Sequence, residues 1–124
     1  MKKILILCAV TLFVGGVLLY RHLRMPSVFG TFTGAPRAEV ADLVERPEAM
    51  RRTTWSVEGV IRDQCTTMGC FFFLREGKAT LRVDLAEIAM NAPKKMNGRK
   101  AHVEGQLVPF DHGYQLWASA VEFE

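Results

Sequence analysis

An uncharged apolar run over residues 4–20 constrains this chain more than any other feature. Its 17 residues are rich in Leu, Ile, Val and Phe, and a helix of that length just spans the hydrocarbon core of a bilayer. Lysines and arginines flank it on both sides, as is typical of a membrane anchor. A cleaved signal peptide has the same outline, but the best cleavage site is the poor match Val14-Gly15-Gly16. We therefore predict an anchor over residues 1–24, with a cleaved signal segment as the alternative.

The length and the charge of the remainder limit its function. The chain has 124 residues, so the part after the anchor has room for one domain. The formal net charge is +3, but from Ala38 onward 11 Lys and Arg oppose 13 Asp and Glu, which gives 11 − 13 = −2. A slightly acidic domain lacks the cationic field that dominates nucleic-acid affinity. A nucleic-acid partner is therefore disfavoured.

The N-terminal tail and the cysteines indicate on which side of the membrane the domain lies. Three residues precede the apolar run, which is the usual arrangement of a signal anchor with a translocated C-terminal domain. Cys8 lies inside the run, which leaves Cys65 and Cys70 as an even pair in the domain. Such a pair is typical of an oxidising compartment. We predict a protein of the inner (cytoplasmic) membrane, with membrane lipid around its helix and its domain on the periplasmic side.

Turn residues and alternation divide the rest of the chain into a linker and a β-rich domain. Residues 25–37 are rich in Pro, Ser, Gly and Thr and are predicted to be a linker that holds the domain away from the bilayer. Residues 38–124 are predicted to be the domain, which begins with an amphipathic helix over residues 38–45. Five strands follow, with a helix or helical turn over residues 85–91 between the third and the fourth. The strands are expected at residues 55–62, 70–75, 79–84, 100–108 and 114–123.

Two glycines at matching places indicate what the five strands form. Residues 55–61 and 101–107 align with Gly59 and Gly105 in register. Glycine inside a strand marks a bulge or sharp bend, which small barrels need at their corners. Bends in the first and fourth strands, with a short helix after the third, match the five-stranded Greek-key barrel called the OB-fold. We therefore predict a mostly β fold, an OB-fold-like barrel preceded by an N-terminal transmembrane helix.

The order of these motifs also resembles a known family, that of small exported or membrane-anchored bacterial OB-fold domains of largely uncharacterised function. The elements that carry the resemblance are Val57-Glu58-Gly59-Val60-Ile61, Cys65, Gly69-Cys70, the aromatic run Phe71 to Phe73, and Gly98 through Val103 and Gly105. They cover about the last 70 residues. The resemblance implies an exported OB-fold barrel and no particular activity.

The sharpest candidate for chemistry is the pair Cys65 and Cys70, where the first strand turns into the second. The first interpretation is a structural disulfide between them, because a C-x4-C spacing across a tight connection can bring two Cβ atoms to the roughly 3.8 Å that a disulfide needs. A metal or haem carrier is the second interpretation, in which both thiolates with His102 or Met68 would hold a soft cation such as Cu(I) or zinc. Thiol redox catalysis is the third, but its C-x-x-C spacing at a helix N-terminus is missing.

A candidate binding surface lies on the second and third strands. Phe71, Phe72 and Phe73 are consecutive, so alternation places at least one ring outside the barrel interior. The leading helix is expected to cover that ring, because its own apolar residues need a partner. Alternatively the ring, Arg75 and Arg82 belong to a patch for a protein or small-molecule partner, on the face where OB-folds commonly bind.

Motifs for catalysis are missing from the sequence. It has no Gly-rich phosphate loop, no G-x-S-x-G and no H-E-x-x-H. Glu58 and Glu104 precede the two matching glycines, and both are expected to face solvent rather than to form an acid-base pair. We predict a binding or assembly module without enzymatic activity or cofactor. The alternatives are the metal or haem carrier and a cytoplasm-facing OB-fold that binds single-stranded nucleic acid.

Overall fold

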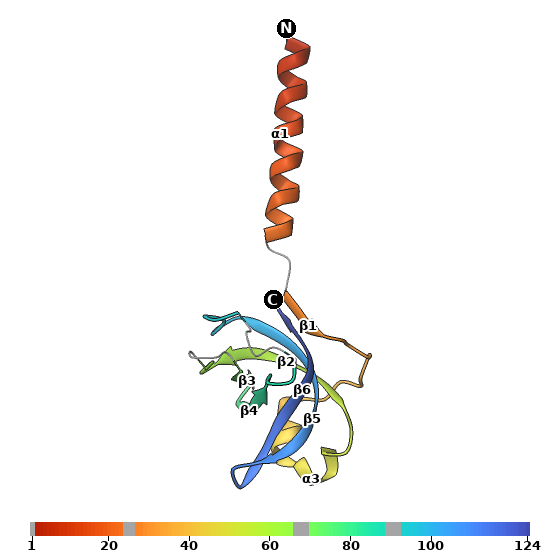
Figure 1. Ribbon diagram of the computed structural model, residues 1–124, viewed down its shortest axis with the longest axis vertical. Helices are drawn as coiled ribbons and strands as arrows, with labels where there is room; N and C mark the ends of the chain where they lie inside the picture. Colours follow the sequence, from red (N-terminus) through yellow and green to blue (C-terminus); the bar gives the residue numbers. More distant parts are fainter. Residues whose placement is uncertain (1, 24–26, 66–69, 89–92) are drawn as a thin grey trace.

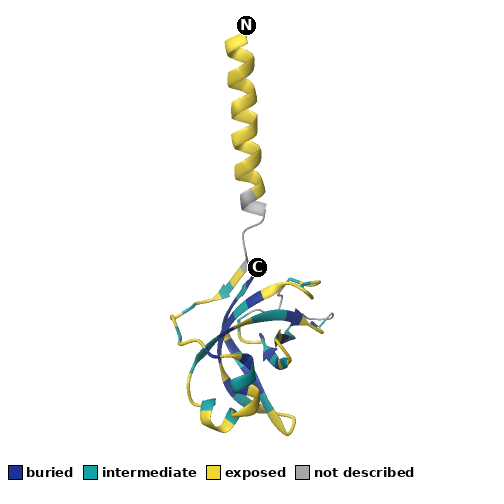
Figure 2. Ribbon diagram, turned by 180° about the vertical axis from the view of Figure 1, so that it is seen from behind, coloured by how far each residue is buried: buried dark blue, intermediate teal, exposed yellow. Residues whose placement is uncertain are grey.

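The N-terminal apolar segment is a single helix that stands clear of a β-rich body (Figure 1). The computed structural model describes residues 2–23, 27–65, 70–88 and 93–124. Helix α1 (Lys2–Leu23) is exposed through Tyr20 (Figure 2). Of the described residues, Lys2–Tyr20 form the one helix long and apolar enough to cross a membrane. The predicted N-terminal helix is confirmed, in a form that a membrane anchor and a signal sequence share.

Five strands close into a barrel, as the sequence predicts. They are β2 (Trp55–Arg62), β3 (Phe71–Glu76), β4 (Ala79–Asp84), β5 (Lys100–Phe110) and β6 (Gly113–Phe123). Their order is β6-β4-β3-β2-β5, and a further β5–β6 pairing joins the two edges. Strand β4 runs parallel to β6, and the other barrel pairs are antiparallel. The fold is therefore mostly β and OB-fold-like.

The two matching glycines lie where strands bend between partners. Strand β2 pairs with β5 up to Val60 and with β3 from Val60 onward, so it changes partner directly after Gly59. Strand β5 has a register shift between Glu104 and Gly105. A Cβ atom at Gly105 would lie 2.3 Å from the Trp117 carbonyl oxygen, so no larger residue fits this close approach. The bends predicted from the glycines are confirmed.

A short helical segment closes one end of the barrel. Helix α2 (Val40–Glu45) has the buried residues Val40 and Leu43, which belong to the core cluster formed by the inward side chains of the strands. Helix α3 (Pro47–Met50) follows directly, and the Trp55 indole donates a 2.8 Å hydrogen bond to the Met50 carbonyl. The predicted leading helix is present because its apolar side chains complete the core.

Part of the segment expected to be a linker is a strand of the sheet. Strand β1 (Ser27–Gly30) pairs antiparallel with the end of β6, from Ser27 opposite Phe123 to Gly30 opposite Ala120. β1 pairs with the part of the β6 edge that β4 does not reach, because β4 pairs with β6 only at Leu116 and Trp117. Three residues, 24–26, therefore separate α1 from the barrel. The prediction that residues 25–37 form a linker is therefore corrected for residues 27–30, which are a strand of the sheet.

The connection between β4 and β5 begins with a turn. The Ile88 N–H donates a 3.1 Å hydrogen bond to the Leu85 carbonyl, and Leu85 is buried in the core. This agrees with the helical turn predicted at residues 85–91. The second half of that range lies outside the described residues.

Candidate functional site: the outer face of strands β3 and β4

Alternation along β3 separates the three consecutive phenylalanines. Phe72 is fully buried and meets the Phe123 ring edge-on at a centroid distance of 6.0 Å. Phe71 and Phe73 lie on the outer face, half-buried, with centroids 6.3 Å apart and planes at 88°. The prediction that a ring lies outside the interior is therefore confirmed for two of the three, whereas Phe72 is removed from the candidate binding set.

Arg82 on β4 is held between two aromatic rings on the same face. Its guanidinium carbon lies 4.2 Å from the Phe71 centroid and 4.1 Å from the Phe110 centroid. The guanidinium also donates a hydrogen bond to the Gln115 side-chain oxygen and lies 3.6 Å from the Asp84 carboxylate. Cation–π contacts and an ion pair at a side chain only 18% exposed fix the guanidinium in place. Arg82 therefore shapes this face and has its charge already partnered.

A groove of about 460 Å³ runs beside Arg82, between the helical segment and the hairpin formed by β5 and β6. One wall comes from α2, where Val44 is 44% exposed. The opposite rim contains Phe110, which is 41% exposed, and Tyr114. Phe73 lies in the groove lining. Helix α2 therefore borders Phe73 across a groove and leaves it half-exposed, so the expectation that the helix covers this face is met only in part.

The predicted binding residues include one that lies outside the groove, Arg75, and omit one that lines it, Phe110. Arg75 is exposed beside the bend at Gly59, where its Nε donates a 3.1 Å hydrogen bond to the Gly77 carbonyl, and it does not line the groove. Phe110 was not predicted, although it directly precedes the Asp111-His112-Gly113 turn. Phe110 contacts Arg82 because β6 pairs with β4 and, through its hairpin with β5, brings Phe110 to the same face.

Cys65 and Cys70 lie at one edge of this region as neighbouring thiols. No disulfide joins them in the structure. The Cys65 N–H donates a 3.0 Å hydrogen bond to the Phe71 carbonyl, and the Cys70 carbonyl accepts one of 2.7 Å from Leu85. Burial, followed by the adjoining Cys65 thiol, raises the pKa of Cys70 above its ordinary value. A raised pKa keeps the thiol protonated and slow to react, which suits a structural pair better than a redox nucleophile.

His102 is not brought to the cysteines. Its ring hydrogen-bonds Ser56 Oγ, at the start of β2, and stacks on Phe32 at 4.7 Å. Cys65 lies beyond the opposite end of β2. The described residues contain no cluster of three or more His, Cys, Asp or Glu that could hold a metal. The metal site that combines His102 with the cysteines is therefore corrected, and Met68 lies outside the described residues.

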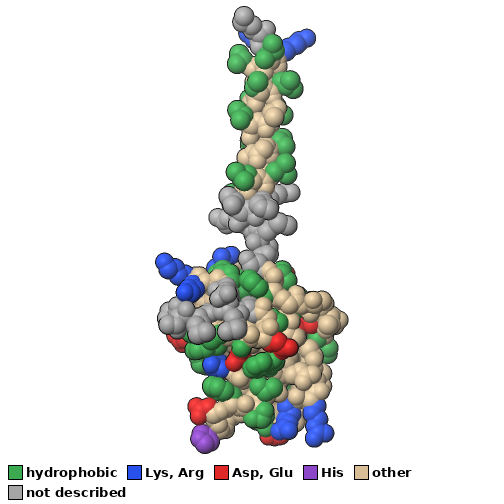
Figure 3. All heavy atoms as spheres, viewed as in Figure 1, with side chains coloured by type: hydrophobic (Ala, Val, Ile, Leu, Met, Phe, Trp, Pro, Cys, Tyr) green, Lys and Arg blue, Asp and Glu red, His purple; other side chains and the backbone are tan. Residues whose placement is uncertain are grey.

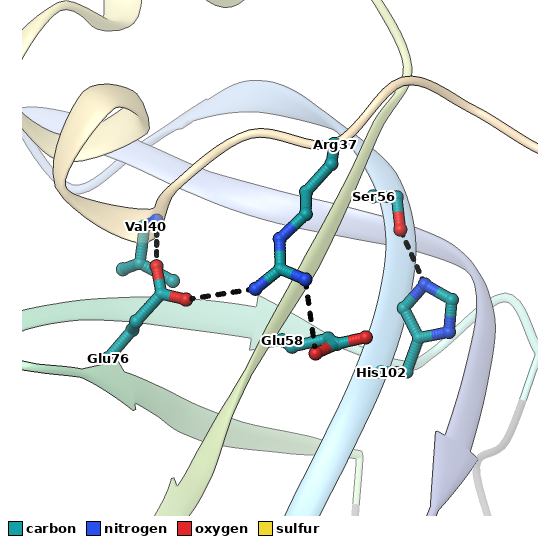
Figure 4. A network of polar contacts seen from close by, with 6 residues as sticks. All are labelled: Arg37, Val40, Ser56, Glu58, Glu76 and His102. Carbon is teal, nitrogen blue, oxygen red and sulfur yellow. Dashed lines mark hydrogen bonds and ion pairs between the residues drawn. The ribbon is translucent and has the colours of Figure 1, made fainter.

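Charged contacts tie the segment before α2 to the barrel (Figure 4). Arg37 bridges Glu58 at 3.5 Å and Glu76 at 3.7 Å, and the second oxygen of Glu76 accepts a 2.9 Å hydrogen bond from the Val40 N–H. The Ser56–His102 contact lies alongside. Arg37 and Glu58 are largely exposed, so their ion pair contributes little to stability. Glu58 faces solvent, as predicted.

Glu104 is buried, which contradicts the expectation that it faces solvent. Only 2% of the residue is exposed. One carboxylate oxygen accepts hydrogen bonds of 2.9 Å from the Thr33 N–H and hydroxyl, and the other accepts bonds of 3.1 and 3.0 Å from Gly34 and Ala35 N–H. Burial alone raises the pKa of Glu104, but these four hydrogen bonds lower it by more, so its pKa lies below its ordinary value. The carboxylate anchors the segment that covers β5.

Comparison with known proteins supports the fold alone. No family model and no curated protein matches the chain. A putative aspartyl-tRNA synthetase from Leishmania major Friedlin aligns over 75% of the chain with a TM-score of 0.55 and 13% identity, and the chain spans 21% of it. The hypothetical protein ygiW from E. coli aligns over 77% of the chain and 99% of its own length, with a TM-score of 0.53 and 13% identity. These similarities agree with the OB-fold-like barrel.

Proposed function

We propose that this chain is a membrane-tethered, extracytoplasmic OB-fold module that binds an apolar segment of a partner protein and carries out no chemistry of its own. In this proposal α1 is a retained anchor. The chain would then belong with the small exported bacterial OB-fold domains that its glycine, cysteine and aromatic pattern resembles. The binding site is the groove between α2 and the β5–β6 hairpin, together with the outer face of β3 and β4.

The observation that carries the proposal is the pair of exposed apolar side chains, Val44 and Phe110, on opposite sides of one groove. Exposed apolar side chains that face each other across a cleft are a common mark of a binding surface. Arg82 already has Asp84 as its partner, so the groove does not require an anionic ligand. An apolar segment of a partner protein fits a groove of this volume that opens to solvent.

Cys65 and Cys70 fit this proposal as a staple at the edge of the binding face. Their side chains are already in contact in the described structure. In an oxidising compartment the pair would form a disulfide across the connection between β2 and β3. This bond would restrict the conformations open to the unfolded chain. For so short a loop the stabilisation is about 2 kcal/mol on the chain-entropy model.

Site-specific crosslinking in living cells tests the binding site. A photo-reactive phenylalanine analogue at Phe110 or Val44 of the full chain is expected to capture the same discrete partner. The analogue at Ser119, exposed on β6 away from the groove, serves as the matched control and is expected not to capture it. Adding Phe73→Ala is expected to lower the yield by about 30-fold, the effect of losing an interface anchor worth roughly 2 kcal/mol.

Two results would contradict this binding site. The first is identical crosslinking from the groove positions and from Ser119. The second is an unchanged yield in a Phe73→Ala chain whose circular dichroism spectrum is native. Salt-sensitive binding of an oligonucleotide to the same chain would instead favour the nucleic-acid alternative, because Phe71, Phe73 and Phe110 also provide rings on which bases could stack.

Thiol trapping tests the staple and the compartment together. We expect acid quenching of whole cells, followed by alkylation of the denatured protein and intact-mass analysis, to show one alkylated cysteine per chain, Cys8, with Cys65 and Cys70 oxidised. The Cys65→Ser chain is the control and should gain one alkylated thiol at Cys70. Alkylation of all three cysteines in the unmodified chain would show a reduced pair and would remove the staple from the proposal.

A further inference from the structure

The connection that leads into β5 carries a concentrated positive charge. Residues 93–100, the basic segment, contain Lys94, Lys95, Arg99 and Lys100, all of them exposed. The sequence has no acidic residue between Glu87 and Glu104. Since the domain from Ala38 onward is slightly acidic as a whole, this segment is a local reversal of its charge.

Strand pairing places the basic segment at the end of the barrel that is joined to α1. Lys100 begins β5, and its carbonyl accepts a 2.9 Å hydrogen bond from the Glu124 N–H. Phe123, the preceding residue, pairs with Ala101 of β5 on one side and with Ser27 of β1 on the other. Figure 3 shows Lys and Arg side chains gathered on the part of the barrel nearest α1.

The short connection to α1 keeps this end of the barrel close to the end of the helix. Three residues lie between Leu23 and Ser27, and an extended chain advances by at most about 3.5 Å per residue. The barrel therefore cannot move more than roughly 15 Å from the helix end. If α1 spans a bilayer, the basic segment lies within reach of the lipid headgroups.

The basic segment is fixed in shape by a buried glutamine. The Gln64 side chain, 7% exposed, donates a 2.6 Å hydrogen bond to the Pro93 carbonyl and accepts one of 2.9 Å from the Met96 N–H. The Gln64 N–H donates a 3.0 Å hydrogen bond to the Asn97 side chain. Next to it, Ile61 exchanges backbone hydrogen bonds with Gly98 and Arg99. The cations are therefore presented from an ordered platform.

The cations of this platform are available to an external anion. Within the part of the chain that the structure describes, none of the four takes part in an ion pair. In the sequence the nearest acidic residues are Glu87 and Glu104, and strand pairing adds Glu124 beside Lys100 and Asp63 just beyond the end of β2. Lys94, Lys95 and Arg99 thus form the core of the positive surface.

We propose that the basic segment binds anionic lipid headgroups of the membrane that holds α1. This inference rests on the retained anchor of the proposed function and deepens it. Basic residues next to a membrane anchor are attracted to an anionic bilayer surface, by about fivefold in affinity for each cation. Docking would also orient the binding groove, because its Phe110 rim lies at the far end of β5 from Lys100, about 30 Å along the strand.

Paramagnetic relaxation measures this contact directly. The full chain is placed in nanodiscs of phosphatidylcholine, or of phosphatidylcholine mixed with phosphatidylglycerol, with a paramagnetic label on a lipid headgroup. We expect strong attenuation of the amide signals of residues 93–100 in the anionic discs, weak attenuation in the neutral discs, and little at Phe110 in either. Lys94→Gln with Lys95→Gln is expected to weaken the attenuation by about tenfold or more in apparent affinity.

A variant with the same charge change elsewhere is the control. Arg46→Gln with Arg52→Gln removes two exposed cations near the helical end of the barrel and is expected to leave the attenuation unchanged. Attenuation that is equal in neutral and anionic discs, or insensitive to the lysine substitutions, overturns the lipid contact and leaves the anchor intact. A chain that does not enter the discs overturns the retained anchor and, with it, this inference.

Discussion

Replacing Glu104 with alanine is expected to lower the free energy of unfolding by about 4 kcal/mol, because several donors lose a charged acceptor at once. Four donors would lose the Glu104 carboxylate as their acceptor: the backbone N–H groups of Thr33, Gly34 and Ala35, and the Thr33 hydroxyl. Urea unfolding of the full chain in detergent, followed by circular dichroism of the β-sheet, measures the loss. We expect β1 and the segment after it to detach first, since Glu104 is their main anchor on β5.

The matched control is Glu58, which occupies the equivalent place before Gly59. Glu58 is largely exposed and its partner is the exposed Arg37. Glu58→Gln is therefore expected to change the free energy of unfolding by less than about 1 kcal/mol. Equal losses for Glu104→Ala and Glu58→Gln would contradict the anchoring role of Glu104.

The pH dependence of stability tests whether the negative charge of Glu104 stabilises the fold, in addition to the hydrogen bonds that its side chain accepts. Its pKa is lowered in the folded chain, so the ionised carboxylate stabilises the fold. That contribution is complete above the unfolded pKa, about 4.3, and is lost as the pH falls through the lower folded pKa. The unmodified chain is therefore expected to lose more stability than Glu104→Gln as the pH falls below about 4.3. Parallel stability curves for the two chains would show that the ionised form contributes nothing.

Replacing Gly105 with alanine is expected to cost about 3 kcal/mol or more, because the added methyl group overlaps backbone. Its Cβ would lie 2.3 Å from the Trp117 carbonyl oxygen and 2.9 Å from the Trp117 carbonyl carbon. Gly59→Ala is expected to be costly for the same reason, since its Cβ would lie 2.6 Å from the Arg75 carbonyl oxygen. Both close contacts occur at corners of the barrel, so the overlap of the added methyl group with the backbone can be relieved only by moving a strand.

Gly113→Ala is the control for both glycine variants. The nearest atom to its added Cβ is the Phe110 carbonyl oxygen at 3.8 Å, an ordinary contact. We expect a change within about 1 kcal/mol, toward greater stability if the unfolded chain loses freedom. A Gly105→Ala chain that unfolds at the same urea concentration as Gly113→Ala would contradict the close packing at the corner.

The sequence predicts the strands of this barrel well because each is defined by local alternation and bounded by local turn residues. Gly59 and Gly105 also reveal the bends, since few residues other than glycine are placed at such corners. The surroundings of Glu104 have no local signal. Its donors lie 69 to 71 positions earlier, in a segment whose composition resembles that of a linker. Only the closed barrel brings them together.

The candidate site was predicted only in part, because some of its contacts also join strands that are distant in the sequence and leave no local signal. Alternation indicates that some of the phenylalanines in residues 71–73 face outward, but three consecutive aromatic residues give no register, so Phe72 could not be excluded. Phe110 joins the site because β6 of the β5–β6 hairpin pairs with β4, a contact between strands that are distant in the sequence. His102 was grouped with the cysteines by residue type alone, although it contacts Ser56 near the start of β2 and Cys65 lies beyond the other end of that strand.

The pairing of β1 with β6 also sets the order of events when the chain is made. Ser27 and Phe123 are partners, and β6 supplies an edge to β1, β4 and β5 alike. No barrel strand other than β2 and β3 has all its neighbours until the final strand has been synthesised. Such non-local pairing makes folding slow compared with helical domains. A nascent chain interrupted before residue 113 would therefore keep unpaired strand edges, which makes it a substrate for chaperones and proteases rather than a smaller folded domain.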